Sequence, residues 1–449
     1  MFKRRFEKTT EVPAPQAEVF AWHTRHGAFQ RLTPPWDKTE VLLYEGIKDG
    51  ERVTLRVLAP WPRKWIAEHE DYIPGLQFKD RQIKGPFPKW VHTHRVEPTL
   101  DGDMQRCVMR DSIEFKLPMG PLGALAYWMF MRKQIYMMFD HRHATLVADS
   151  VDHQKYSRRK KLTVAITGAS GMLGKALSAF LSTGGHTVRA VPRRDELTFD
   201  LDAIAGADVL VHLAGEPIAQ KWNKDVKDRI RRSRIGRTRL LCEQIGRIPE
   251  AERPKVMLSA SATGVYGNRG GNLLTEDSGE GEGFLAEVAG GWEDATAAAS
   301  DVGIRVVHLR TGIVLHPGGG ALRKMLPVFS KGLGGRLGSG DQYMSWITQD
   351  DHVRAMLHAM MDDRLRGPVN LVAPDPVTNQ EFTKTLGKVL RKPTVVTAPR
   401  AALRFAFGEM ADEALLSSQR VEPMRLKSAG FTFRQPKLEQ ALRELLGRH

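Results

Sequence analysis

The chain of 449 residues is 41% hydrophobic and 27% charged, which excludes predominant disorder and leaves room for about two to four domains. Its two cysteines, Cys107 and Cys242, exclude a disulfide scaffold and are too few for a thiolate zinc site, unless histidines supply most of the ligands. Acidic residues interleave with the basic residues that give the formal charge of +15, so we expect no nucleic-acid surface and favour anionic small molecules as partners.

The N-terminal residues carry no recognisable export signal, because the basic residues 3–5 lead into polar and charged residues instead of an apolar run. The longest apolar stretch, 119–131, has about 13 residues, whereas a membrane-spanning helix needs about 20. Two unpaired cysteines without an export signal predict a cytoplasmic protein with no membrane span.

Residues 1–153 are predicted to form an α+β domain. The residue pattern predicts strands over 6–12, 53–58, 90–96 and 104–116, a short helix over 15–23 and a long helix over 121–147. The basic, polar stretch 154–161 is interpreted as an exposed linker to the rest of the chain.

The order of these elements, with the segments 6–15, 19–24, 32–36, 85–94 and 109–115, resembles the helix-grip fold of START-like, polyketide-cyclase-like ligand-binding domains. The resemblance implies a curved sheet that grips the long helix around an apolar cavity. Trp128 and Met131 are candidates for its lining, and the alternative is that such side chains fill a solid core. His92 and His94 alternate on one strand face and either contact a ligand or serve the structure; no metal site is assigned in the chain.

After the linker, the pattern changes to that of a nucleotide-binding fold. A β-branched run over 162–167 leads into Gly168, Gly171 and Gly174, followed by a predicted helix over 175–183 and a strand over 186–191. In such a βαβ unit the first glycine permits a tight turn, the second lets a pyrophosphate approach the backbone, and the third lets helix and strand pack closely. The helix N-terminus offers free N–H groups to the phosphates. We therefore predict a doubly wound parallel Rossmann sheet over 162–397.

Several further segments resemble the extended and atypical short-chain dehydrogenase/reductases: 208–215, 256–267, 310–315 and 346–353. A narrower resemblance, which includes 214–219, 338–343 and the C-terminal segment 398–449, is to the epimerase family of these enzymes with its C-terminal domain of unknown function. Beside the three glycines, the resemblance implies cofactor contacts by Ser170, Met172, Leu173, Asp200, Leu213, Ala214, Gly215, Ser259 and Arg310.

The residues after the second strand bear on the choice of cofactor. NAD enzymes commonly place a carboxylate there, whereas this chain has Arg193 and Arg194, with Asp195 following a little late. Guanidinium groups suit a 2′-phosphate because they form bidentate, charge-assisted bonds. We therefore expect NADP in preference to NAD.

The usual catalytic pair of the family, Tyr-x-x-x-Lys, is absent, and Leu285 and Ala289 stand at its positions. The predicted catalytic candidates are Ser261, Thr263 and Tyr266, with Glu216, Glu287 and His212 as other sources of a proton. The predicted function is an NADP(H)-binding oxidoreductase or epimerase that acts on an apolar or sugar-like small molecule, with an N-terminal domain that binds an apolar ligand. The alternative is a non-catalytic protein that senses the nucleotide.

Overall fold

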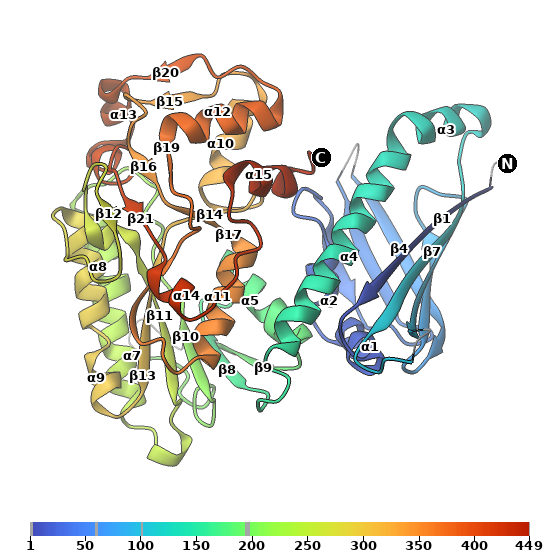
Figure 1. The fold of residues 1–449 in the computed structure, drawn as a ribbon, viewed down its shortest axis with the longest axis horizontal. Helices are drawn as coiled ribbons and strands as arrows, with labels where there is room; N and C mark the ends of the chain where they lie inside the picture. Colours follow the sequence, from blue (N-terminus) through green and yellow to red (C-terminus); the bar gives the residue numbers. More distant parts are fainter. Residues whose placement is uncertain (1–2, 59–61, 100–101, 194–197, 449) are drawn as a thin grey trace. The chain divides into compact units, whose positions relative to one another are not determined.

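The computed structural model describes residues 3–58, 62–99, 102–193 and 198–448 (Figure 1). The chain divides into two compact units, one of residues 1–160 with 179–185 and the other of residues 161–178 with 186–449. None of the helices in the described ranges combines the length and the apolar character needed to cross a bilayer.

Within the described residues of the first unit, seven strands form one antiparallel sheet in the order β1-β7-β6-β5-β4-β3-β2. The strands are β1 (Lys3–Val12), β2 (Glu40–Tyr44), β3 (Arg52–Val57), β4 (Arg63–Ile73), β5 (Gln77–Lys84), β6 (Lys89–Pro98) and β7 (Cys107–Lys116). The helices are α1 (Gln16–Thr24), α2 (Ala28–Leu32), α3 (Gly120–Ala126) and α4 (Arg132–Gln154), with a π turn over Tyr127–Met131 between the last two.

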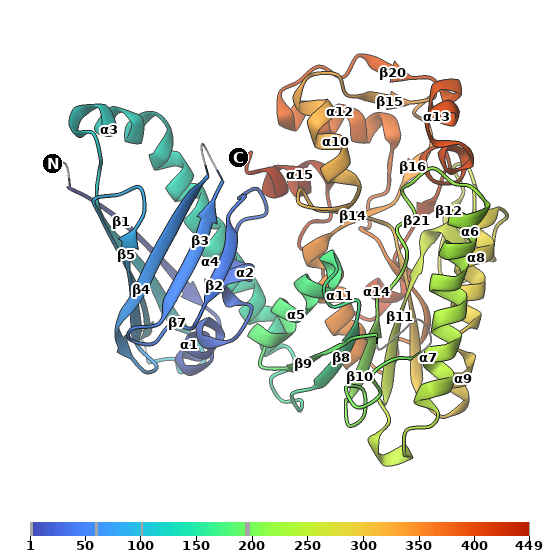
Figure 2. The ribbon, with the colours of Figure 1, turned by 180° about the vertical axis from the view of Figure 1, so that it is seen from behind.

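The long helix α4 lies across one face of this sheet (Figures 1 and 2). Its residues Phe139 and Leu146 are almost fully buried and belong to two separate apolar clusters on that face. The antiparallel sheet with its gripping helix confirms the predicted helix-grip fold of the first unit.

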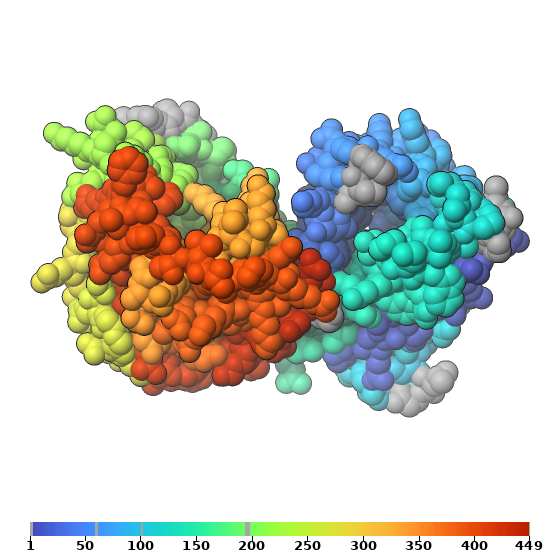
Figure 3. All heavy atoms as spheres, turned by 90° about the horizontal axis from the view of Figure 1, so that it is seen from above, coloured from blue at the N-terminus to red at the C-terminus, as the bar shows by residue number. Residues whose placement is uncertain are grey.

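The proposed lining role of Trp128 is wrong, because its side chain is 61% exposed. The π turn over Tyr127–Met131 places one more residue in the turn than an α-helix would, and Tyr127 instead faces the core. Met131 is partly buried against the same core cluster. Figure 3 shows teal atoms from the C-terminal part of the first unit on the surface, and within this part Trp128, Met129 and Phe130 are exposed.

Within the described residues of the second unit, six parallel strands form the main sheet in the order β18-β13-β11-β10-β8-β9. These strands are β8 (Thr163–Thr167), β9 (Thr187–Val191), β10 (Val209–His212), β11 (Val256–Ala262), β13 (Arg305–Thr311) and β18 (Gly367–Leu371). Helices α7 (Arg237–Ile245) and α8 (Phe284–Asp294) cover one face, and α5 (Met172–Thr183) and α11 (Gln349–Met361) cover the other (Figures 1 and 2). This arrangement confirms the predicted doubly wound Rossmann sheet.

Among the described residues, one strand of the usual doubly wound pattern is not seen beside β9. In the described part of the connection between β9 and β10, residues 198–208 form turns and an isolated bridge between Arg193 and Phe199. The segment that resembles the family's fourth strand, β10, is therefore the third strand of this sheet along the described chain, and β9 lies at the sheet edge.

Further elements of the second unit lie outside the main sheet. They are α6 (Lys224–Arg231), a 3-10 turn over Thr263–Tyr266, β12 (Leu273–Leu274), α9 (Ala297–Asp301), β14 (Ile313–Leu315), α10 (Gly320–Ser330), β15 (Gly335–Leu337), β16 (Tyr343–Met344), β17 (Trp346–Thr348), β19 (Val377–Thr378), α12 (Asn379–Leu390), β20 (Val396–Ala398), α13 (Arg400–Phe407), β21 (Arg420–Val421), α14 (Met424–Ser428) and α15 (Leu438–Leu446).

The C-terminal segment is built into the second unit. Its strand β21 pairs with β12, and its helix α15 shares an apolar cluster with α12 through Leu442 and Phe382. Backbone N–H groups of Arg434 and Gln435 donate to the carboxylate of Asp351 in α11 at 2.9 and 3.0 Å. The segment therefore extends the core of the nucleotide-binding fold.

Candidate functional site

The glycine turn after β8 combines two tightly constrained glycines, Gly168 and Gly174, with a third, Gly171, that has more room around it. Gly168 has a φ of +72°, which L side chains rarely adopt. A Cβ on Gly174 would lie 2.3 Å from the carbonyl oxygen of Gly168, so any side chain there would break the turn. A Cβ on Gly171 would meet that same oxygen at 3.2 Å and nothing else within 4 Å. Gly171 and its neighbour Ser170 are exposed. The turn therefore leaves open space beside Gly171, at the N-terminus of α5.

Other segments border this turn. A Cβ on Gly168 would lie 3.0 Å from the backbone nitrogen of Ala214, so the loop of Leu213, Ala214 and Gly215 after β10 packs directly against the glycine turn. Gln349 at the start of α11 donates to the carbonyl oxygen of Met172 at 3.1 Å. A Cβ on Gly319 would lie 2.2 Å from Met172 Sδ. The structure thus brings the predicted residues of the turn and the β10 loop together, under a glycine-rich loop over 316–320.

The end of β9 is partly described. Arg193 is exposed just beyond the strand, and Asp200 is half-buried. The backbone N–H of Asp200 donates to the carbonyl oxygen of Pro192 at 3.4 Å, so Asp200 lies close to the residue that precedes Arg193. Arg194, the second predicted ligand of a 2′-phosphate, lies outside the described residues.

A buried ion pair lies near the ends of β11 and β13. Arg310 donates from Nε and Nη2 to the two carboxylate oxygens of Glu293, each at 2.8 Å. Its Nη1 donates to the hydroxyl of Tyr266 at 3.0 Å and, more weakly, to a backbone carbonyl oxygen. Ser261 donates to the same carboxylate at 2.6 Å, and the Tyr266 hydroxyl donates to Asn370 at 2.7 Å. Three predicted site residues thus share one network.

The electrostatics of this network follow from its bonds. Burial disfavours the ionised form of Glu293, but the bonds from Arg310 and Ser261 outweigh burial and hold its pKa below the usual range. Burial raises the pKa of Tyr266, although the adjacent guanidinium opposes that shift. At neutral pH the network holds an ion pair and a protonated phenol that already has an acceptor.

The remaining predicted residues occupy different surroundings. Thr263 donates to the side-chain oxygen of Gln419, in the C-terminal segment, at 2.9 Å. Ser259 is buried on β11, where its hydroxyl makes one long bond of 3.4 Å to the next residue's carbonyl oxygen. His212 is fully buried between the hydroxyls of Thr167 and Thr238, and its pKa falls to about 4 because of burial.

Helix α8 carries the positions where the short-chain dehydrogenase pair would stand. A Cβ on Gly264 would lie 3.5 Å from Leu285 Cβ, so this helix packs on the turn that holds Thr263 and Tyr266. Ala289 is buried, and Glu287 is exposed, where it pairs with Arg231 on the surface. Apolar side chains therefore stand where a titrating pair would be needed.

Sequence reasoning missed two groups at this site. Arg234 is buried beside Gly215, donates to the carbonyl oxygen of Glu216 at 3.0 Å and stacks on Trp292, and burial lowers its pKa to about 10. Gln419 reaches Thr263 from a distant part of the chain. No pattern in the neighbouring sequence predicts either residue, because the place of each in the site depends on contacts with distant parts of the chain.

Comparison with known proteins places these features in a family. The model of the NAD dependent epimerase/dehydratase family matches residues 164–371, the model of a domain of unknown function, DUF1731, matches 398–445, and the polyketide cyclase / dehydrase and lipid transport model matches 12–140. An epimerase family protein of Mycobacterium bovis is 45% identical over 292 residues, which cover 62% of this chain and 96% of the relative. This chain belongs to the epimerase family.

Two solved structures resemble this epimerase-family chain. The human epimerase family protein SDR39U1, solved with NADPH, is 32% identical with a TM-score of 0.59, and the match covers 64% of this chain and 100% of the human chain. A protein from Corynebacterium glutamicum described as a nucleoside-diphosphate sugar epimerase is 34% identical with a TM-score of 0.79, over 98% of this chain and 90% of that one. The second match extends over both units of the epimerase-family chain.

Proposed function

We propose that the second unit binds NADP(H) at the turn of Gly168, Gly171 and Gly174 and acts as an oxidoreductase or epimerase on a sugar-like small molecule. The observation that carries the proposal is the exposed side of Gly171, where only the Gly168 carbonyl oxygen lies within 4 Å of an added Cβ and a pyrophosphate has room to approach. The free N–H groups at the start of α5 face the same space. The NADPH-bound human relative supports the choice of cofactor.

The selectivity for the 2′-phosphate is assigned to Arg193 and Arg194. Arg193 is exposed beyond the end of β9, at the sheet edge. There, a guanidinium can approach a phosphate without losing a buried partner. Asp200 and the loop of Leu213, Ala214 and Gly215 complete the proposed adenosine side.

The three glycines allow a sharp test of cofactor binding. Calorimetric titration of the full chain with NADPH should give binding that Gly171→Leu abolishes, while the variant lowers the thermal unfolding temperature far less than Gly174→Leu does. Gly174→Leu is the matched comparison, because its side chain collides with the chain's own backbone and should lower stability as well as binding. Unchanged NADPH binding by Gly171→Leu would refute the proposed site.

The bound nicotinamide would supply hydride transfer, and the chain would have to orient a substrate and handle a proton. Of the three catalytic candidates, Thr263 is bonded to a neutral amide, whereas Ser261 donates to a carboxylate and Tyr266 is tied to both an arginine and an asparagine. We therefore assign Thr263 to substrate orientation, with Ser261 and Tyr266 holding the network behind it. A screen of sugar-nucleotide and carbonyl substrates with NADPH should find turnover that Thr263→Val reduces more than Ser261→Ala does.

One observation favours a second candidate function, that of a nucleotide sensor without catalysis. The apolar Leu285 and Ala289 leave α8 with no proton donor at the usual positions, and the candidate hydroxyls all have partners. Tight NADPH binding with no turnover in the substrate screen would support the sensor.

For the first unit, we propose a ligand between the sheet and α4. The apolar clusters around Phe139 and Leu146 and the match to the polyketide cyclase and lipid transport model support it. Along β6 and β7, the buried side chains of His92, His94 and Asp111 lie between these two clusters, so the ligand should carry a polar group as well as an apolar body.

A further inference from the structure

The inner face of the first unit's sheet carries a buried row of ionisable side chains across four neighbouring strands. In the strand register, His69 on β4 lies opposite Asp80 on β5, Asp80 lies opposite His92 on β6, and His94 on β6 lies opposite Asp111 on β7. All but Asp80 are less than 10% exposed. Burial of such a row is costly unless the charges and donors find partners.

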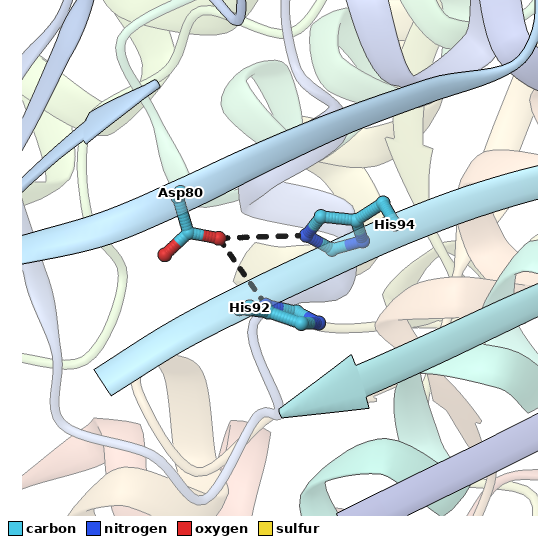
Figure 4. Close-up of side chains that lie close together, drawn as sticks. All are labelled: Asp80, His92 and His94. Carbon is cyan, nitrogen blue, oxygen red and sulfur yellow. Dashed lines mark ion pairs between the residues drawn. The ribbon is translucent and has the colours of Figure 1, made fainter. Parts of the chain in front are cut away.

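Three of these side chains converge on one point. Figure 4 shows the imidazoles of His92 and His94, from one strand, turned toward the same carboxylate oxygen of Asp80 on the next. Asp80 Oδ2 lies 3.3 Å from His92 Nδ1 and 3.7 Å from His94 Nε2. Hydrogen bonds of this kind are usually about 2.7–3.2 Å long. Two donors bound at about 2.0–2.1 Å to one tetrahedral ion lie about 3.3–3.4 Å apart, which these separations approach.

From this convergence we propose that Asp80, His92 and His94 bind a divalent transition-metal ion, such as Zn²⁺ or Fe²⁺, between the sheet and α4. Two imidazoles and one carboxylate suit such ions, whereas Mg²⁺ and Ca²⁺ prefer oxygen ligands alone. The proposal does not depend on the nucleotide site of the second unit.

The far sides of both imidazoles have the surroundings that metal-bound histidines need. Asp111 Oδ1 lies 3.3 Å from His92 Nε2 and 2.7 Å from His94 Nδ1, so one carboxylate faces the second nitrogen of each ring. A metal-binding histidine almost always donates this second N–H to a carboxylate or carbonyl, which fixes the ring orientation. His143 in turn donates to the other oxygen of Asp111 at 2.9 Å and bonds with the hydroxyl of Thr10 at 2.8 Å. The proposed ligands are thus held by an outer layer of bonds.

The proposed site has room for an exogenous ligand. Asp111 faces the ring nitrogens that point away from Asp80 and therefore stays outside the first coordination sphere. Three protein ligands leave at least one position of a four-coordinate ion for water or for a polar group of a bound molecule. The Asp80 side chain is 17% exposed, which gives the ion a route to solvent.

The test uses the full chain, freed of any affinity tag and stripped with a chelator, without nucleotide. Calorimetric titration with Zn²⁺, and anaerobically with Fe²⁺, should give one ion per chain with a dissociation constant below about 1 µM. His92→Gln and Asp80→Asn should weaken binding at least about 100-fold, and Asp111→Asn about 10–100-fold. His352→Gln is the control, because His352 is a buried histidine of the second unit, bonded to the Thr311 hydroxyl, and this variant should bind the ion normally.

A second measurement keeps the proposal falsifiable if a variant does not fold. X-ray absorption of the native protein loaded with Zn²⁺ should show two imidazole ligands and otherwise oxygen. No binding by the native chain, or binding that His92→Gln and Asp80→Asn leave unchanged, would overturn the proposal.

Discussion

The ion pair between Arg310 and Glu293 gives the sharpest prediction of stability. Both side chains are less than 10% exposed, and the guanidinium forms two 2.8 Å bonds to the carboxylate. Arg310→Met removes the cation and leaves a buried, unpaired carboxylate, which should cost about 3–5 kcal/mol. For a unit of this size, that loss lowers the unfolding temperature by about 6–20 °C. The double variant Glu293→Leu/Arg310→Met removes both charges, so it should be more stable than Arg310→Met alone, although the Ser261 hydroxyl loses its acceptor.

Differential scanning calorimetry measures the difference in unfolding temperature between the single and double variants. Calorimetric titration with NADPH, below the unfolding temperature, tests whether Arg310 instead contacts the cofactor. Because each nitrogen of the Arg310 guanidinium already donates a hydrogen bond within the protein, we expect NADPH affinity to change by less than about threefold in the double variant. The reasoning is refuted if the double variant is no more stable than the single one. A native unfolding temperature with a tenfold loss of NADPH affinity would instead show that Arg310 binds the cofactor, as the family resemblance implies.

Three further predictions concern other parts of the second unit. Burial lowers the pKa of His212 to about 4 from 6.5, so its contribution to stability is complete above pH 6.5 and declines as the pH falls toward 4, by about 2 kcal/mol at pH 5. Urea unfolding at pH 7 and pH 5 should show a smaller loss for His212→Gln than for the native chain. The double variant Arg193→Ala/Arg194→Ala should bind NADP at least about tenfold more weakly and bind NAD as the native chain does. If a titration shows that NADP and NAD binding weaken equally, the two arginines do not contact the 2′-phosphate. Thr378 caps α12, because its hydroxyl accepts from the Glu381 N–H at 3.2 Å. Thr378→Ala should therefore lower the free energy of unfolding by about 1 kcal/mol. A free energy of unfolding that calorimetry finds unchanged would contradict this prediction.

The nucleotide-binding half was predictable because its signals are local. The positive φ of Gly168 and the tight contact at Gly174 are requirements of a single turn, so the spacing of the glycines and the flanking β and helical patterns suffice to identify it. The hydroxyl network was not predictable in the same way. Ser261, Tyr266 and Arg310 were placed in the site, but their shared bonds depend on how β11 and β13 pair and on the position of α8.

Of the strands in the first unit that the sequence did not reveal, β4 and β5 are rich in charge, whereas β2 is apolar but exposed. β4 contains several charged residues and buries His69 and Ala67, so its pattern lacks the apolar alternation that identifies a half-buried strand. The alternation of His92 and His94 did place both on one face. Their convergence with Asp80 follows from the pairing of β5 with β6, which is non-local information that a single strand cannot contain.

The bonds that tie the C-terminal segment to the nucleotide-binding fold bear on how such proteins evolve. Gln419 holds Thr263, β21 pairs with β12, and Asp351 accepts from the backbone of residues 434 and 435. A gene truncated before residue 398 would encode a sheet with an exposed apolar surface and an incomplete site. Natural selection should therefore keep the two sequence families together in one reading frame, and the boundary between them is not a position where the polypeptide can be divided.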